Sequence, residues 1–240
     1  MYPVTDPTES TDPTDAIDAT GPARIPVTDR TRIRQVGHKA SHDRSVLYRI
    51  LDAGHVGHLA IVRDGQPYVL PVAYGRDGDR VLLHGSTGSR LFRTLATGVP
   101  TCLEVTLVDG LVLARSAFET SMHYRSVMVL GRCEVVPTDQ KLAAMERITE
   151  HILPGRWAQL RPPKRKELAA TLVLALPLTE VSVKVSDAPP DDFSEDLDFP
   201  VWAGVVPLRT VTGTPVPAPD LRFDLPAPQS AAGAPDRFNP

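Results

Sequence analysis

Three short apolar runs separated by tight turns constrain the fold of this chain more than any other feature of its sequence. The runs HVGHLAIV (55–62) and PYVLPVAY (67–74) are separated by the four residues RDGQ, and a third run follows at 80–84. An Asp-Gly pair between two apolar runs is a strong signal for a β-hairpin. The segment therefore predicts three consecutive antiparallel strands, joined as a meander.

The remaining pattern alternates further strand signals with a few short helices. Asp43 is a good N-cap, Gly54 is a good stop, and the apolar residues between them recur at helical spacing. Pro71 predicts a free edge or a bulge in the second strand, and Gly131 predicts a bulge in a later one. Helices are predicted at 44–53, 140–152 and 164–170 and after Arg90, and strands at 99–108, 111–118, 123–136, 178–185 and 201–208, with the pair 99–108 and 111–118 joined by a turn at Asp109–Gly110.

Such a series predicts a mainly β fold with short α-helices. About six antiparallel strands, too poorly interleaved with helices for repeated βαβ units, fit a small closed or split β-barrel of Greek-key type. The ends of the chain have a different composition: residues 1–27 are rich in Asp, Thr and Pro, and residues 211–240 are rich in Pro. Both are predicted to be disordered tails around a globular domain at 28–210.

Charge and cysteine usage exclude several classes of function. The formal net charge is −3, which gives little support for binding to nucleic acid. Cys102 and Cys133 are far apart and form no C-x-x-C pair, so neither a disulfide framework nor a metal site is expected. The N-terminus lacks the basic and apolar regions of a signal peptide, and no apolar run is long enough to span a bilayer. The expectation is a cytoplasmic protein without a membrane segment.

The stretch Gly85–Arg90, with the sequence GSTGSR, carries the clearest chemical signal. It links a predicted strand to a predicted helix, whose N-terminal N–H groups attract anions. Ser86, Thr87 and Ser89 can donate hydroxyl hydrogen bonds, and Arg90 can bind phosphate oxygens. The alternative interpretation is an ordinary strand–turn–helix connection with a hydroxyl cap, because the segment matches neither a P-loop nor a dinucleotide fingerprint.

Taken together, three stretches resemble a known family. GHVGHLAIVRDGQPYVLPVAYGRDGDRVLLHGSTGSR, HYRSVMVLGRCEVV and FPVWAGVVPL occur in this order between residues 38 and 208. This order is similar to the pyridoxamine 5'-phosphate oxidase-like FMN-binding split barrels, and within them to the NimA-like proteins related to 5-nitroimidazole reductases. The chain departs from the true oxidases at Val201–Gly204, where their basic substrate-binding pattern is missing, which argues against oxidation of vitamin B6.

The resemblance implies a homodimer with FMN at the subunit interface. It places the second strand along the flavin ring, the end of the third strand against the ring and ribityl chain, and Ser89 and Arg90 on the phosphate. The partner subunit would add side chains, and Trp202 would close one side of the ring. The implied contacts are Leu70, Pro71, Val72 and Ala73, then His84, Gly85 and Ser86, and from the partner Tyr124, Arg125 and Ser126.

Two classes of function follow from this resemblance. The first is an oxidoreductase that reduces a small acceptor such as a nitroaromatic, with His84 as the candidate catalytic residue because an imidazole can change its charge near neutral pH. The second is a flavin carrier or redox sensor without turnover. A third hypothesis keeps the barrel but exchanges the ligand for haem or a deazaflavin, with His84 or His58 as the iron ligand. His55 and His58 face opposite sides of a strand and make a poor pair for a metal ion.

Overall fold

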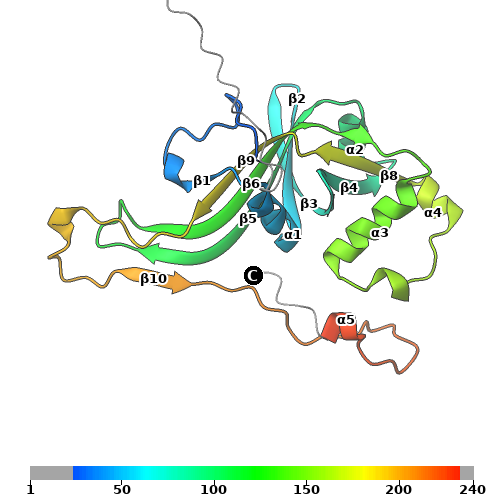
Figure 1. Cartoon of the computed structure of the whole chain (residues 1–240). Helices are drawn as coiled ribbons and strands as arrows, with labels where there is room; N and C mark the ends of the chain where they lie inside the picture. Colours follow the sequence, from blue (N-terminus) through cyan, green and yellow to red (C-terminus); the bar gives the residue numbers. More distant parts are fainter. Residues whose placement is uncertain (1–23, 233–240) are drawn as a thin grey trace, which may run out of the picture.

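The computed structural model describes residues 24–232 and confirms the mainly β, antiparallel class (Figure 1). The described residues form ten strands, against about six expected: seven longer strands and three very short ones, β1, β7 and β10. The strands are β1 (Ala40–Ser41), β2 (Val56–Arg63), β3 (Gln66–Asp77), β4 (Arg80–Ser86), β5 (Pro100–Leu113), β6 (Ser121–Arg132), β7 (Glu134–Val135), β8 (Thr171–Pro177), β9 (Glu180–Ser186) and β10 (Gly204–Pro207). The helices are α1 (Arg44–Ala53), α2 (Arg90–Ala96), α3 (Lys141–Ile152), α4 (Arg165–Ala169) and α5 (Gln229–Ala232), with 3-10 turns at Gly37–Lys39, Trp157–Gln159 and Ser194–Asp196.

The predicted meander is present as β2, β3 and β4. Asp64 and Gly65 both have positive φ, at 51° and 75°, as a two-residue hairpin turn requires. β3 pairs with β2 along Gln66–Ala73 and with β4 only along Tyr74–Asp77. Pro71 therefore lies where β3 has a neighbour on one side only, which confirms the predicted free edge and explains why a residue without an N–H is tolerated.

The sheet curls around one main core. Its order is β1-β9-β6-β5-β2-β3-β4-β8-β7, with β10 added to β5. β7 follows β6 in the chain but pairs with β8 at the other end of the order, so one continuous segment connects the two halves. Side chains from both halves meet in the core, among them the fully buried Tyr74, Leu83, Leu103, Val127 and Leu174.

Helix α1 anchors β3 to this core. The Asp43 carboxylate accepts a hydrogen bond from Ser45 N–H at 2.7 Å and caps the helix, as predicted. Arg76 of β3 donates two hydrogen bonds to Asp52 of α1, at 2.7 and 2.6 Å, and its guanidinium lies 4.3 Å from the centre of the Tyr48 ring. The inner half of β3 is thus held rigidly, while its outer half remains at a free edge.

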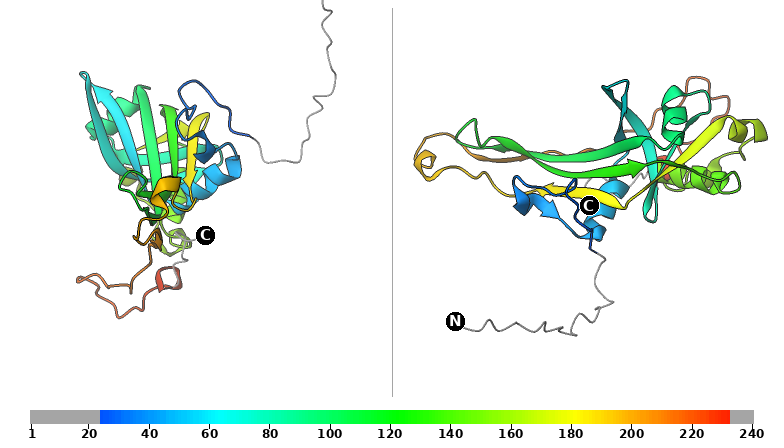
Figure 2. Two further views of the ribbon diagram at one scale, coloured as in Figure 1. Left: turned by 90° about the vertical axis from the view of Figure 1, so that its left-hand side faces the viewer. Right: turned by 90° about the horizontal axis from the view of Figure 1, so that it is seen from above.

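The strands β5 and β6 form a long hairpin that extends away from the helical end of the molecule (Figure 2). The predicted turn at Asp109–Gly110 and a separate strand at 111–118 are wrong. β5 continues through Gly110 to Leu113 with only a register shift after Val108. A Cβ on Gly110 would lie 3.1 Å from the carbonyl oxygen of Val206, so this glycine allows β10 to approach rather than turning the chain.

Two further expectations about strands need correction. Gly131 pairs in register with Thr101, and the strand is interrupted instead at Cys133, between β6 and β7. A Cβ at Gly131 would lie 3.0 Å from Leu176 Cδ1, so packing explains the glycine. The sequence predicts no strand at 171–177, yet Thr171–Pro177 forms β8, a buried strand between β4 and β7.

The packed region and the extended C-terminal segment can be located in the structure. Ile25 is buried in the core, and its N–H donates to His42 O at 2.9 Å, so the packed region begins before residue 28. Residues 208–228 run as an extended, mostly exposed segment after β10. Residues 1–23 and 233–240, which hold most of the predicted N-terminal tail and the end of the C-terminal one, lie outside the described part. No helix among the described residues has the length and apolar character needed to cross a membrane.

Candidate functional site

A small cavity opens between the β2–β3 hairpin and α2, and it brings together two residues of the predicted flavin site, Leu70 and Arg90. Its volume is about 160 Å³. The lining includes two arginines and no acidic side chain. The lining residues are Ile61, Arg63, Tyr68, Leu70, Arg90, Leu91 and Thr94.

Strand alternation explains this lining. Tyr68 and Leu70 project from the same face of β3 as the core residue Tyr74, but they lie where the strand has left β4. They therefore remain partly exposed, at 47% and 39%. Val72, on the same face, is half-buried, whereas Pro71 and Ala73 are exposed on the opposite face.

The charge of the cavity comes from its arginines. Arg63 pairs with the exposed Asp64 at 3.3 Å. Arg90 is exposed and makes no ion pair or hydrogen bond through its side chain with any described residue. A guanidinium without a carboxylate partner, at the mouth of a cavity that holds no acid, can take the phosphate of a ligand.

The backbone of the Gly85–Arg90 turn is largely occupied by its own hydrogen bonds. Thr87 N–H donates to Ala170 O at 2.9 Å, Gly88 N–H to Ser86 Oγ at 3.1 Å, and Ser89 N–H to Ser86 O at 2.9 Å. Ser89 also caps α2 by accepting from Phe92 N–H at 3.5 Å. The capacity of this turn for an anion therefore resides in side chains, above all Arg90, more than in the backbone donors that the sequence suggested.

Gly85 has a packing role in this turn. A Cβ at residue 85 would collide with the ring of Phe92, the buried residue through which α2 packs on β4. Gly88, in contrast, has open space around it, with Ser86 Oγ as the nearest atom at 3.5 Å. The structure therefore explains Gly85 by the packing of α2 on β4.

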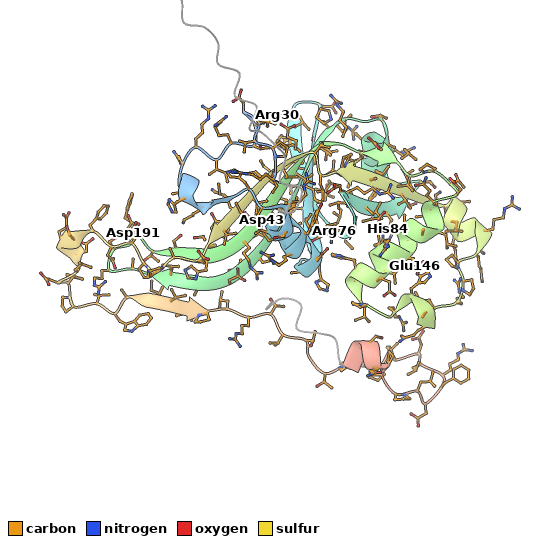
Figure 3. The ribbon with its side chains drawn as sticks, viewed as in Figure 1. Arg30, Asp43, Arg76, His84, Glu146 and Asp191 are labelled. Atoms are coloured by element: carbon orange, nitrogen blue, oxygen red, sulfur yellow. The ribbon has the colours of Figure 1, made fainter. Side chains whose placement is uncertain are left out.

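His84 faces away from this cavity. Because Gly85 faces Phe92, the neighbouring His84 projects from the other side of β4, together with Leu82, which packs in a second cluster with Ala144 and Ile148 of α3. Figure 3 shows His84 on this side, near α3. Its Nδ1 is buried without a hydrogen-bond partner among the described residues, and burial lowers the pKa of the imidazole. The structure thus separates His84 from Arg90, although five residues connect them.

The site residues that the resemblance assigned to a partner subunit, and Trp202, lie on the long arm. Tyr124, Arg125 and Ser126 belong to the part of β6 beyond the core, and Trp202 precedes β10. β10 and α2 lie on opposite sides of the molecule (Figures 1 and 2). Arg125 pairs with Asp109 at 2.7 Å, which raises the pKa of its guanidinium, and Trp202 is 66% exposed with its ring against Gly204. A single chain therefore does not bring them to Arg90.

Sequence reasoning missed a second hollow, the outer groove, on the face of the sheet opposite the core. It consists of two adjoining cavities, of about 360 and 460 Å³, that share Arg30. The first is lined by Ala60, Val62, Pro67, Pro100, Cys102, Leu130 and Arg132 among others, and the second by Arg32, Arg34, Glu104, Ser126, Met128, Ser182 and Lys184 among others. The sequence signal for this face is the alternation along β5 and β6, which places the side chains of even-numbered residues on the outer side of the sheet. The segment 30–35, which forms one side of the groove, has no regular structure and gives no such signal.

Comparison with solved structures places this geometry among known proteins. The chain is similar to an FAD and haem binding protein from Mycobacterium smegmatis, with 46% identity, a TM-score of 0.79, and coverage of 81% of this chain and 96% of the other. It is similar to the flavocytochrome Anf3 from Azotobacter vinelandii, with 40% identity, a TM-score of 0.80, and coverage of 85% and 95%. A protein from Bacteroides thetaiotaomicron whose name refers to 5-nitroimidazole antibiotic resistance shares the fold at 21% identity and a TM-score of 0.52, over 61% of this chain and 86% of the other.

Sequence comparisons agree with the structural ones. An uncharacterized protein of Rhizobium meliloti is 25% identical over 91 residues, which are 38% of this chain, and the match spans about half, 53%, of that relative's length. The family model described as pyridoxamine 5'-phosphate oxidase matches residues 43–185, more than half of the chain. The chain therefore belongs to the pyridoxamine 5'-phosphate oxidase family.

Proposed function

We propose that this protein binds a flavin between the free edge of β3 and helix α2 and transfers electrons through it. The observation that carries the proposal is that one cavity joins Leu70, on the uncovered part of β3, to the unpaired guanidinium of Arg90. A flavin nucleotide needs an apolar wall for its ring and a cation for its phosphate. The residues present fit both requirements.

The protein's own groups have distinct roles in this proposal. Arg90 and Arg63 bind phosphate oxygens, the unpaired edge of β3 meets the polar rim of the ring, and Tyr68 and Leu70 exclude water from its face. A bound flavin supplies hydride or single-electron transfer. The oxidoreductase hypothesis requires a small acceptor, for which a nitroaromatic is the candidate from the sequence, and the carrier or sensor hypothesis requires none.

The flavin is proposed to be FAD. The relatives that are 46% and 40% identical are an FAD and haem binding protein and a flavocytochrome, and both are covered almost over their full length. FMN, the expectation from the sequence, has the same ring and first phosphate and is the alternative. The same two relatives support the proposal that this chain takes a haem in addition to the flavin.

A homodimer completes the proposed site. Large apolar side chains are exposed along the β2–β3 hairpin, including Val62 at 65% and Val69 at 62%. The arm that carries Tyr124–Ser126 and Trp202 is too far from its own α2 to contribute to the cavity, so only the arm of a second copy can reach it. These two features are what a symmetric interface would use.

The experiment is native mass spectrometry of the purified full chain, followed by release and identification of the bound cofactor. A dimer mass with one FAD per chain is expected, and FMN instead would correct the flavin while keeping the site. Steady-state turnover with NADH or NADPH and a nitroimidazole then separates an enzyme from a carrier. A preparation that stays free of flavin, even after incubation with FAD and FMN, would refute the proposed function.

A further inference from the structure

We propose that the larger cavity of the outer groove binds the adenosine diphosphate moiety of a dinucleotide. This cavity, which we call the cationic cavity, has a volume of about 460 Å³ and lies between the segment 30–35 and the outer face of β5, β6 and β9. Its volume is in the range of small-ligand pockets. The inference rests on the proposed function, which requires an FAD and, for turnover, a nicotinamide dinucleotide as electron donor. Both ligands carry this moiety.

The segment that forms one side of the cationic cavity has no regular structure, yet it is held in place. Thr28 Oγ1 donates to Glu180 Oε1 at 2.7 Å, and Arg30 Nε donates to the same oxygen at 2.9 Å. Arg32 N–H donates to Thr28 O at 2.9 Å and closes a turn. The backbone that carries Arg32 and Arg34 is therefore positioned over the sheet before a ligand binds, which lowers the entropic cost of binding.

The side chains around this cavity are mostly basic among its charged groups. Four basic residues line it against one acidic residue. Arg30 is paired with Glu180. Arg32, Arg34 and Lys184 form no ion pair with any described residue. Because guanidinium and ammonium groups bind phosphate oxygens through charged hydrogen bonds, three such groups in one cavity match the charge of a diphosphate.

The floor of the cavity adds groups that suit a nucleoside. Met128 of β6 lies opposite Glu104 of β5 on one side and Ser182 of β9 on the other. Met128 and Ile33 are half-buried and line the cavity from the sheet and from the segment above it. They offer a flexible apolar contact for a purine ring, and Ser182 offers a hydroxyl.

Glu104 is the acid among the described residues that line the cavity. Its Oε1 accepts a hydrogen bond from Thr106 Oγ1, and its Oε2 lies 3.5 Å from His58 Nδ1. An ionised carboxylate has about four acceptor positions, so it can accept further hydrogen bonds from a ligand. Carboxylates at dinucleotide sites accept from the hydroxyls of a ribose. The acid therefore fits a ribose next to the diphosphate and disfavours an additional phosphate on that ribose.

The position of the cavity favours FAD as the source of the moiety. Ser126 lines the cationic cavity and is also one of the residues that the proposed homodimer brings to the flavin of the second copy. Met128 follows two residues later on β6, about 7 Å away at the rise of a β-strand. An FAD with its ring and first phosphate between Leu70 and Arg90 of one copy would thus place its second phosphate and adenosine in the cationic cavity of the other copy.

The test is isothermal titration of the flavin-free, full-length protein with ADP as the probe. The wild type is expected to bind ADP more tightly than inorganic phosphate. Arg34→Ala should weaken ADP binding by about 10–100-fold, through the loss of a hydrogen bond to a charged group. Arg165→Ala, at an exposed arginine of α4 outside the outer groove, removes the same charge and should bind ADP as the wild type does.

Displacement experiments separate the two sources of the moiety. If the moiety belongs to FAD, FAD displaces ADP and FMN does not, and Arg34→Ala lowers the affinity for FAD but not for FMN. If it belongs to the electron donor, NADH displaces ADP from protein that is already loaded with flavin, and NADPH does so more weakly because of Glu104.

Several results would overturn the assignment. They are no binding of ADP, equal ADP affinities of the wild type and Arg34→Ala, and binding of inorganic phosphate as tight as that of ADP. A protein that binds flavin but no ADP would reject this cavity and leave the proposed function intact. A protein that binds ADP but neither FAD nor FMN would reject the proposed function and keep the cavity.

Discussion

At the scale of single residues, the proposed flavin site depends on a cation that the fold leaves unpaired. Many exposed arginines in this structure have a carboxylate partner, such as Arg30 with Glu180 and Arg161 with Glu167. Arg90 and Arg93, both on α2, have no such partner among the described residues, but only Arg90 lines the cavity. This difference provides a matched pair of variants.

Arg90→Ala is expected to weaken flavin binding by about 1.5–3 kcal/mol, the worth of a hydrogen bond to a charged group. Arg93→Ala removes the same charge from the same helix and should leave the affinity close to that of the wild type. Isothermal titration of flavin-free protein measures both. Equal affinities for wild type and Arg90→Ala would place the phosphate elsewhere.

The two glycines of the turn before α2 make a second prediction. Gly85→Ala is expected to destabilise the protein by about 1–3 kcal/mol, because the added Cβ collides with Phe92 and forces α2 off β4. Gly88→Ala meets no atom closer than 3.5 Å and should change stability by less than about 0.5 kcal/mol. Urea unfolding monitored by circular dichroism compares the two. Equal stabilities of the two variants would mean that the packing of α2 on β4 does not depend on the absence of a side chain at Gly85.

At the scale of elements, the short helix α4 is held by its N-terminal charges. Glu167 accepts two hydrogen bonds from Arg161, at 2.9 and 2.6 Å, and one from Lys164 N–H at 2.8 Å. The bonds to Arg161, and then the one to Lys164 N–H, lower the pKa of Glu167 from 4.5 to about 2. α4 leads directly into β8, the buried strand that pairs with β4.

The depressed pKa of Glu167 fixes the direction of its pH dependence. Its contribution to helix α4 is present above pH 4.5, the ordinary value, and is lost as the pH falls toward about 2. Carboxyl ¹³C NMR should report a Glu167 midpoint well below those of other glutamates, and Arg161→Gln should move it upward. A midpoint near 4.5 in the wild type would show that the pair does not form in solution.

At the scale of the whole molecule, the structure is a compact curled sheet with a long arm. In Figure 3, Asp191 on the arm and His84 near α3 lie on opposite sides of the molecule. The arm carries exposed apolar side chains, including Phe118 at 83%, whose ring stacks on Phe193. Exposure of so much apolar surface to water is unfavourable, and the proposed homodimer would bury the arm against a second copy.

Trp202 provides a test of this arrangement. A dimer of about 52 kDa, twice the chain mass of 26.1 kDa, is expected by sedimentation. If the partner's arm reaches the flavin, Trp202 should quench flavin fluorescence, and Trp202→Phe should raise it. Trp157→Phe, on the 3-10 turn after α3, is the control and should leave it unchanged. A monomer with bound flavin, or equal emission in both variants, would contradict the shared site.

The local sequence determined helix α1 and the hairpins of the β2–β3–β4 meander. Asp43, Gly54 and the Asp64–Gly65 turn act within a few residues, so capping and turn chemistry predicted α1 and the β2–β3–β4 meander. Pro71 revealed a free edge because it lacks an N–H. The resemblance located Leu70 and Arg90, which the structure places on one cavity.

Only the tertiary structure decided the rest, because those features depend on contacts between distant segments. The local sequence around Gly110 predicts a turn, but β5 continues through this residue. The missing side chain of Gly110 allows β10 to approach closely. His84 and Arg90 are near neighbours in the chain, yet β alternation and the packing of Phe92 send them to different faces. The pairing of His58 with Glu104, 46 residues apart, exists only because β2 and β5 are adjacent in the sheet.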